Sequence, residues 1–159
     1  MQLSHTLPVV SAAFDDPNIV SSAGLVPMMK LARQAQLRQL TDEHLSVPGD
    51  KGANAGLKLS SVVAGMIAGA DSIDDLALLR HGAMGKVCDR AYAPSTLGSF
   101  LRSFASGHVR QADAVASRML ANLAGQSPVL GDPGQDSMVM VDIDDTIIEV
   151  HGYAKQGAG

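Results

Sequence analysis

The segment "MVMVDIDDTIIEVHG", residues 138–152, places three aspartates among the most strand-like residues of the chain. Its Val, Met and Ile residues predict one strand or a tight pair of strands. Residues two apart on a strand share a face, so we expect Asp142 and Asp144 on one side and Asp145 on the other. Neighbouring carboxylates resist burial unless a cation joins them, and Mg²⁺ prefers such oxygen ligands. The alternative is that these aspartates mark a strand end and a solvated turn.

The composition favours helix packing upstream of this segment. The chain has 159 residues, of which 46% are hydrophobic and 18% charged, as in ordinary globular proteins. Aromatic residues make up 3% and Trp is absent, so Ala, Leu, Val and Met must fill a core. These residues suit packed helices better than a β-sandwich.

Five helical patterns precede the aspartate segment. They predict a helix from Pro27 to about Leu40, a buried apolar helix at 62–70 capped by Ser60 or Ser61, and a helix that opens with a capping box of Ser72 and Asp75 and ends at Gly82. They also predict a helix after Pro94 with Ser95 as its cap, and a longest helix at 108–124 closed by Gly125.

The pattern divides the chain into four parts. They are an irregular lead-in at 1–23, a helical region at 24–125, a linker rich in Gly, Pro, Asp and Ser at 126–136, and a strand-like part at 137–159. One or two strands do not form a stable sheet alone, and an unpaired strand edge invites aggregation. We therefore expect the strand-like part to be the start of a larger α/β domain.

Charge and cysteine content narrow the function classes. Residues 1–135 carry eleven basic and eleven acidic residues, whereas residues 136–159 carry one basic and five acidic, so the net charge of −4 belongs to the last part. A chain with this charge lacks the basic surface of proteins that coat nucleic acid, so this class is disfavoured. Cys88 is the single cysteine, which excludes an internal disulfide. No leader pattern and no membrane-length apolar run appear, so we expect a cytoplasmic protein without membrane partners.

Two families carry aspartates in this context. The string "DIDDT" after a hydrophobic strand resembles the D-x-D-x-T signature of haloacid-dehalogenase-like phosphatases. That resemblance implies Asp142 as the nucleophile and Asp144 as the general acid. The family needs a long Rossmann-like body after the motif, and only fifteen residues follow Asp144 here.

The second resemblance covers most of the chain. Four blocks together are similar, in order, to the N-terminal part of bacterial insertion-sequence transposases with a group-1 DDE domain. The blocks are "FDDPNIVSSAGLVPMMKLA" (14–32), "ADSIDDLALLRHGAMGKV" (70–87), "APSTLGSFLRSFASGHVRQADAVASR" (93–118) and "VDIDDTIIEVHGYAKQGAG" (141–159). The resemblance implies a mainly α N-terminal region followed by the first strand or strands of an incomplete α/β ribonuclease-H-like domain.

The transposase resemblance also implies a chemistry. Asp144, in a D-x-T context, matches the first catalytic aspartate and a ligand of Mg²⁺, with Asp142 as a second candidate ligand. Two Mg²⁺ ions activate the attacking oxygen and stabilise the leaving oxygen of a phosphodiester, which gives cleavage at transposon ends and strand transfer into target DNA. The family's second aspartate and its glutamate are expected beyond residue 159, so we expect this chain alone to be inactive. A homo-oligomer is expected only of a full-length form.

Candidate DNA contacts lie in the helical region. Ser95 and Thr96 lie at the start of a predicted helix, where their hydroxyls could contact a DNA phosphate, and Arg102 follows on the same helix. Arg110 and Arg118 are eight residues apart on the last helix and share a side. The plain alternatives are an ordinary capped helix and arginines that only solvate a helix face. A non-catalytic helical DNA-binding module therefore stays open as a third function class.

Overall fold

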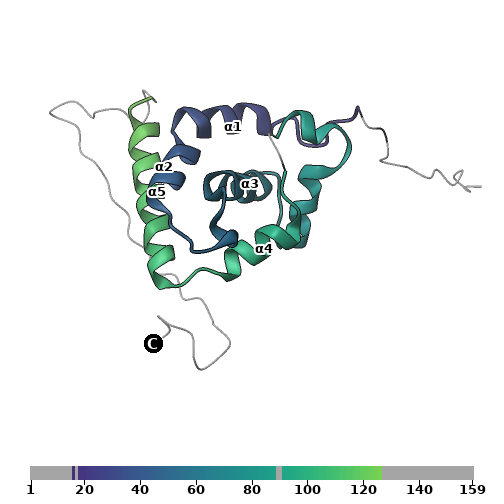
Figure 1. The fold of residues 1–159 in the computed structure, drawn as a ribbon. Coiled ribbons are helices and arrows are strands. Elements are labelled where there is room, and N and C mark those ends of the chain that lie inside the picture. The colour runs from purple at the N-terminus through teal and green to yellow at the C-terminus, as the bar shows by residue number, and fades with distance from the viewer. Residues whose placement is uncertain (1–15, 17, 89–90, 127–159) are drawn as a thin grey trace, which may run out of the picture.

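The computed structural model describes residues 16, 18–88 and 91–126 (Figure 1). Helix accounts for 69% of this part and no described residue lies in a strand, which confirms the mainly α prediction for the region upstream of the aspartates. The predicted linker and the predicted strands at 137–159 lie outside the described residues.

Eight helical elements follow one another along the described chain. They are α1 (Leu25–Gln34), α2 (Leu37–His44), the 3₁₀ turn η1 (Asp50–Gly52), α3 (Ala55–Ile67), the 3₁₀ helices η2 (Asp74–Arg80) and η3 (Gly82–Lys86), α4 (Pro94–Arg102) and α5 (Ser106–Ala124).

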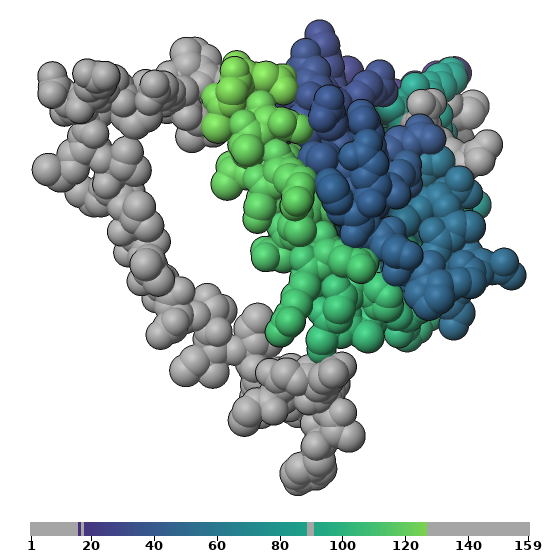
Figure 2. All heavy atoms as spheres, turned by 60° about the vertical axis from the view of Figure 1, so that its left-hand side comes forward, coloured from purple at the N-terminus to yellow at the C-terminus, as the bar shows by residue number. Residues whose placement is uncertain are grey.

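Helix α3 occupies the centre and the other elements surround it (Figure 1). It contacts α1, α2, α4 and η2, while α5 packs along α1 and α2. Figure 2 shows α5 as a continuous ridge beside the surface of α1 and α2. Because its neighbours differ from one side to the next, α3 has surfaces of different composition, on which the two hollows described below form.

Leu, Ala, Val and Met fill most of the core, as the composition predicts, and Phe100 is the largest of the fully buried side chains in the described part. One cluster joins α1 to α3, η2 and η3, a second joins α1 and α2 to α5, and a third joins the α2–α3 connection to α4. Helices α2 and α3 approach closely at Gly56, where an added Cβ would lie 2.5 Å from the Arg38 carbonyl oxygen. A side chain at this position would force the two helices apart.

The prediction of one helix from Pro27 to Leu40 is wrong, because the chain breaks between α1 and α2. Gln36 adopts a left-handed conformation with φ 64° and ψ 26°. In an unbroken helix, Ala35 and Leu37 would point about 200° apart. The break lets both side chains be buried, at 0% and 4% exposure. Burial of apolar side chains on both sides of the break outweighs the cost of the left-handed residue.

The start of α3 also differs from the prediction. Ser60 and Ser61 are not caps but lie inside the helix, where their hydroxyls donate to the carbonyls of Gly56 and Leu57 at 2.7 and 2.8 Å. Serine is tolerated inside a helix when its hydroxyl bonds to the carbonyl four residues back. The expected burial of the 62–70 run is wrong at its end, since Met66 and Ile67 are exposed.

The predicted helix after Ser72 differs in type and bounds, because η2 is a 3₁₀ helix with Ile73 as its N-cap, ends at Arg80, and is followed by η3, which begins at Gly82. The predicted hydrogen bonds between Ser72 and Asp75 and the predicted end of α5 are confirmed. The Ser72 backbone N–H donates to the Asp75 carboxylate at 2.9 Å and the Asp75 N–H contacts the Ser72 hydroxyl at 3.3 Å, which is the predicted capping box. Helix α5 ends at Ala124 with Gly125 as its C-cap. Not all apolar residues of α5 are buried, because Val109 and Leu120 are each 60% exposed.

Candidate nucleic-acid interface

The predicted metal ligands Asp142 and Asp144 lie outside the described residues. Within residues 16, 18–88 and 91–126, no three His, Cys, Asp or Glu side chains gather as a metal site. The magnesium site at these aspartates therefore stays a prediction.

Helix α4 begins without a side-chain hydrogen bond from its N-cap residue to the first turn. Its N-cap is Ala93, in an extended conformation with φ −65° and ψ 145°, and Pro94 is the first helical residue. The prediction of Ser95 as the cap is therefore wrong by two positions. Pro94 takes this place because proline has the φ of a helix and needs no N–H partner there. No side chain of the N-cap residue hydrogen-bonds to the first turn of this helix, whose N-terminus carries a partial positive charge.

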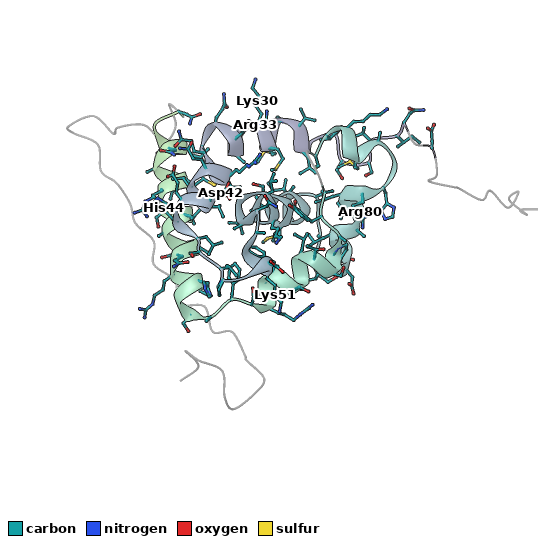
Figure 3. The ribbon with its side chains drawn as sticks, in the orientation of Figure 1. Lys30, Arg33, Asp42, His44, Lys51 and Arg80 are labelled. Carbon is teal, nitrogen blue, oxygen red and sulfur yellow. The ribbon has the colours of Figure 1, made fainter. Side chains whose placement is uncertain are left out.

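Two of the five predicted DNA contacts, Ser95 and Thr96, lie together beside lysines. They line a concave surface of about 320 Å³ between η1, α3 and α4, which we call the lysine hollow. Its lining residues are Asp50, Lys51, Lys58, Ser95, Thr96 and Ser99. Figure 3 places Lys51 on the lower side of the molecule with α4, away from Lys30 and Arg33 at the top. The exposed ammonium of Lys51, three hydroxyls and a helix N-terminus suit a phosphate group, while Asp50 is the one carboxylate in the described lining.

Lys58 is the buried member of the lysine hollow, at 5% exposure. Its ammonium group donates to the Lys51 carbonyl oxygen at 2.8 Å. It also lies 5.8 Å from the ring centroid of Tyr92 and 5.5 Å from that of Phe100. A buried ammonium needs such partners, and aromatic faces attract cations at these distances. Lys58 therefore fixes η1 and α4 against α3, while Lys51 remains exposed to solvent.

The three predicted arginines lie elsewhere. Arg102 is at the far end of α4, and its guanidinium folds back over Gly98, where an added Cβ would lie 3.0 Å from Nη1. Arg110 and Arg118 are exposed on α5, and Nη1 of Arg118 donates to the Ala114 carbonyl at 3.0 Å. None of the three lines the lysine hollow.

Sequence reasoning missed Lys51 and Lys58. Lys58 interrupts the run "AGLKLSSVVAGMI" of small and apolar residues, which was the available signal for a buried charge. Lys51 carried no such signal, because the Gly-rich stretch around it lacks the context of a phosphate loop.

His108 and Cys88 have structural surroundings in the described part. His108 Nδ1 accepts the backbone N–H of Ala105 at 2.9 Å, so this histidine caps the start of α5. Burial raises the pKa of the Cys88 thiol, which keeps it protonated at neutral pH and a poor nucleophile. Neither side chain has the surroundings of a catalytic group.

Among the described residues, no helix combines the length and apolar character that a membrane span requires. Comparison of the chain with protein-family models, with curated proteins and with solved structures finds no match in any of the three.

Proposed function

We propose that this chain is the N-terminal part of a DDE transposase of a bacterial insertion sequence, and that its helical region binds DNA. The observation that carries the DNA-binding part is the lysine hollow. It combines the N-terminus of α4 with Lys51, Lys58 and the hydroxyls of Ser95 and Thr96.

Phosphate fits this set for electrostatic reasons. The first turn of a helix presents N–H groups and a partial positive charge, and hydroxyl and ammonium groups beside it add donors. Asp50 is the only acidic lining residue against two lysines, so the described lining carries a net positive charge. Such contacts hold DNA by its backbone and carry no sequence information.

Helix α5 supplies a second set of candidate contacts. Arg110 and Arg118 are exposed and about 12 Å apart along the axis, from the helical rise per residue. The overall charge balance of residues 1–135 makes the expected DNA affinity modest. We therefore expect binding that depends on a few local contacts and weakens steeply with salt.

Catalysis is proposed to involve the aspartate segment. In this proposal Asp144 is the first catalytic acid and holds Mg²⁺ with Asp142, on the basis of the D-x-T pattern and the shared strand face. If the chain has lost catalysis, its helical region would still be a DNA-binding module. The binding experiment below tests DNA binding for the transposase and for the non-catalytic module alike.

The test measures binding of the full chain to a fluorescent mixed-sequence DNA duplex by anisotropy. Lys51→Ala and the pair Ser95→Ala with Thr96→Ala should each weaken binding about tenfold, because charge-assisted phosphate contacts are lost. Lys30→Ala is the matched control, since Lys30 is an exposed lysine on the opposite side, on α1. Equal affinities for all of these chains, or no binding by the wild type at low salt, would overturn the proposal.

A further inference from the structure

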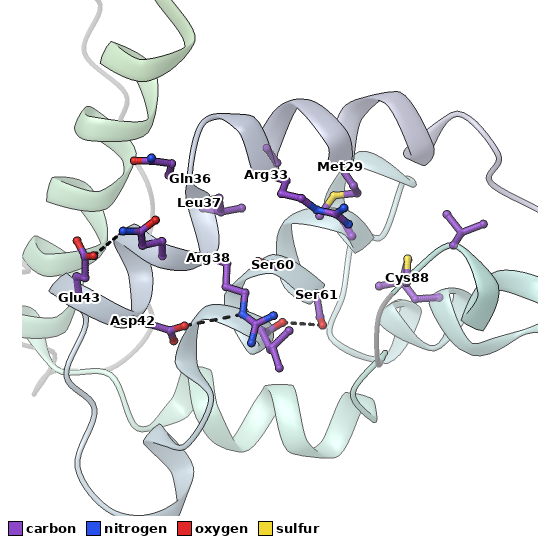
Figure 4. Close-up of a pocket in the computed structure, with 16 residues that line it drawn as sticks. Met29, Arg33, Gln36, Leu37, Arg38, Asp42, Glu43, Ser60, Ser61 and Cys88 are labelled. Atoms are coloured by element: carbon purple, nitrogen blue, oxygen red, sulfur yellow. Dashed lines mark hydrogen bonds and ion pairs between the residues drawn. The ribbon is translucent and has the colours of Figure 1, made fainter.

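A larger pocket opens on a different side of α3, between α1, α2 and the segment around Cys88 (Figure 4). Its volume is about 630 Å³, within the range of small-molecule sites in proteins. We call it the arginine pocket. Its apolar walls include Leu37, Ala64 and Leu79, which are themselves buried at 4%, 2% and 1% exposure.

The pocket exists because the chain breaks at Gln36. The left-handed residue turns α2 away from the line of α1, and both helices then overhang α3. The side chain of Gln36 is occupied on the α5 side, where its Oε1 accepts from Asn122 Nδ2 at 3.4 Å. The left-handed residue thus places α1 and α2 on two sides of one pocket.

Two exposed arginines from different helices line this pocket. Arg33 lies on α1 beside Met29, and Arg38 lies on α2 beside Asp42 (Figure 4). Among the described residues, Arg33 makes no ion pair. Arg38 has one, in which its Nε lies 3.9 Å from Asp42 Oδ2, too far for a hydrogen bond.

The acidic residues of the pocket already have other partners. Asp42 accepts the Gly56 backbone N–H through Oδ1 at 2.8 Å. Glu43 accepts from the Gln39 side-chain amide at 2.9 Å. Cys88 adds no charge, because burial raises its pKa. Both carboxylates keep their negative charge, so the described lining holds two positive and two negative side chains. The N–H donors of Arg33 and part of those of Arg38 nevertheless remain available for a ligand.

We propose that the arginine pocket binds a small amphipathic anion, a carboxylate with a hydrocarbon body. Arg33 and Arg38 hold the carboxylate, since a guanidinium matches its two oxygens with parallel N–H donors. Leu37, Leu57 and Leu79 contact the hydrocarbon. The hydroxyls of Ser60 and Ser61 donate to main-chain carbonyls and leave only lone pairs toward the pocket.

This inference does not rest on the proposed DNA binding. The arginine pocket shares no lining residue with the lysine hollow. The two proposals therefore fail or succeed separately.

The test titrates decanoate into the full chain below its micellar concentration, by calorimetry. The wild type should bind at a single site, and Arg33→Gln should weaken binding about tenfold because one charge-assisted contact is lost. Lys30→Gln, an exposed charge removed from the same helix α1, should leave the affinity unchanged.

Two further measurements distinguish specific binding in the arginine pocket from nonspecific hydrophobic binding. Ser60→Leu fills the pocket from α3 and should abolish decanoate binding, with circular dichroism used to verify that the helices are retained. Decan-1-ol, which lacks the carboxylate, should bind more weakly than decanoate. Decanoate binding that is absent, unaffected by both variants, or matched by decan-1-ol would overturn the proposal.

Discussion

The arginine pocket and the lysine hollow are both lined by residues of α3, yet their linings differ in chemistry. Leu57, Ser60, Ser61 and Ala64 recur at helical spacing and line the arginine pocket, whereas Lys58 points to another side and lines the lysine hollow. The first is mainly apolar with cations from α1 and α2, and the second is polar with cations from η1 and α3. One central helix therefore separates the pocket proposed for an amphipathic anion from the hollow proposed for phosphate.

The two sides are also supported by different parts of the core. Phe100, Leu45, Val47 and Ala55 hold α4 beside the lysine hollow. The arginine pocket depends on α1 and α2, which pack through Leu37 and other residues onto α5. A substitution in one of these two core clusters should therefore perturb the hollow beside it more than the other hollow.

The largest effect is expected from Phe100→Ala on the lysine side. Phe100 is fully buried, packs edge-to-face on Phe104 at 5.0 Å and contacts the Lys58 ammonium. We expect a loss of about 3–5 kcal/mol in the free energy of unfolding, measured by urea denaturation. Leu120→Ala, at a 60% exposed site on α5, should change it by less than about 0.5 kcal/mol. Equal effects of the two variants would contradict the core assignment.

A smaller effect, with opposite signs at two positions, is expected on the arginine side. Gln36→Gly removes the left-handed strain and should stabilise the protein by about 0.5–1 kcal/mol. Gln39→Gly, three residues on and inside α2, should destabilise it by about 1 kcal/mol. Urea denaturation of both variants measures the pair. Destabilisation by Gln36→Gly as large as that by Gln39→Gly would show that the helix does not break at this residue.

The smallest effect concerns the start of η2, an element that packs against α3 and α4. Hydrogen bonds from the Ser72 hydroxyl and backbone lower the pKa of Asp75 below its usual 3.8. A lowered pKa in the folded state contributes stability above the unfolded pKa and loses it as the pH falls through the folded pKa. Asp75→Asn should therefore lower the melting temperature slightly at pH 7 and not below the lowered pKa. The same difference at both pH values would rule out the charged capping box.

Local patterns were predictable from the sequence where neighbours along the chain settle the structure. Helix α5 has a long periodic pattern and a closing glycine, and Ser72 and Asp75 cap each other within four residues. These features need no distant partner. The end of α5 at Gly125 and the capping box at Ser72 follow directly from such neighbours.

The remaining features depend on contacts between distant residues. Gln36 takes a left-handed conformation because α5 and α3 bury the residues on both sides of it, and nothing in glutamine itself favours that conformation. Lys58 is buried because Tyr92 and Phe100, more than thirty positions away, supply aromatic faces. The candidate site was accordingly found in part, through Ser95 and Thr96, and its lysines were missed.

The most direct test of the proposed function is the salt dependence of DNA binding by the full chain and by Lys51→Ala. A phosphate contact releases counterions, so the plot of log K against log salt should be steep for the wild type and shallower by about 1 for the variant. Lys30→Ala should keep the wild-type slope. A slope that Lys51→Ala leaves unchanged would contradict the assignment of the lysine hollow to the DNA backbone.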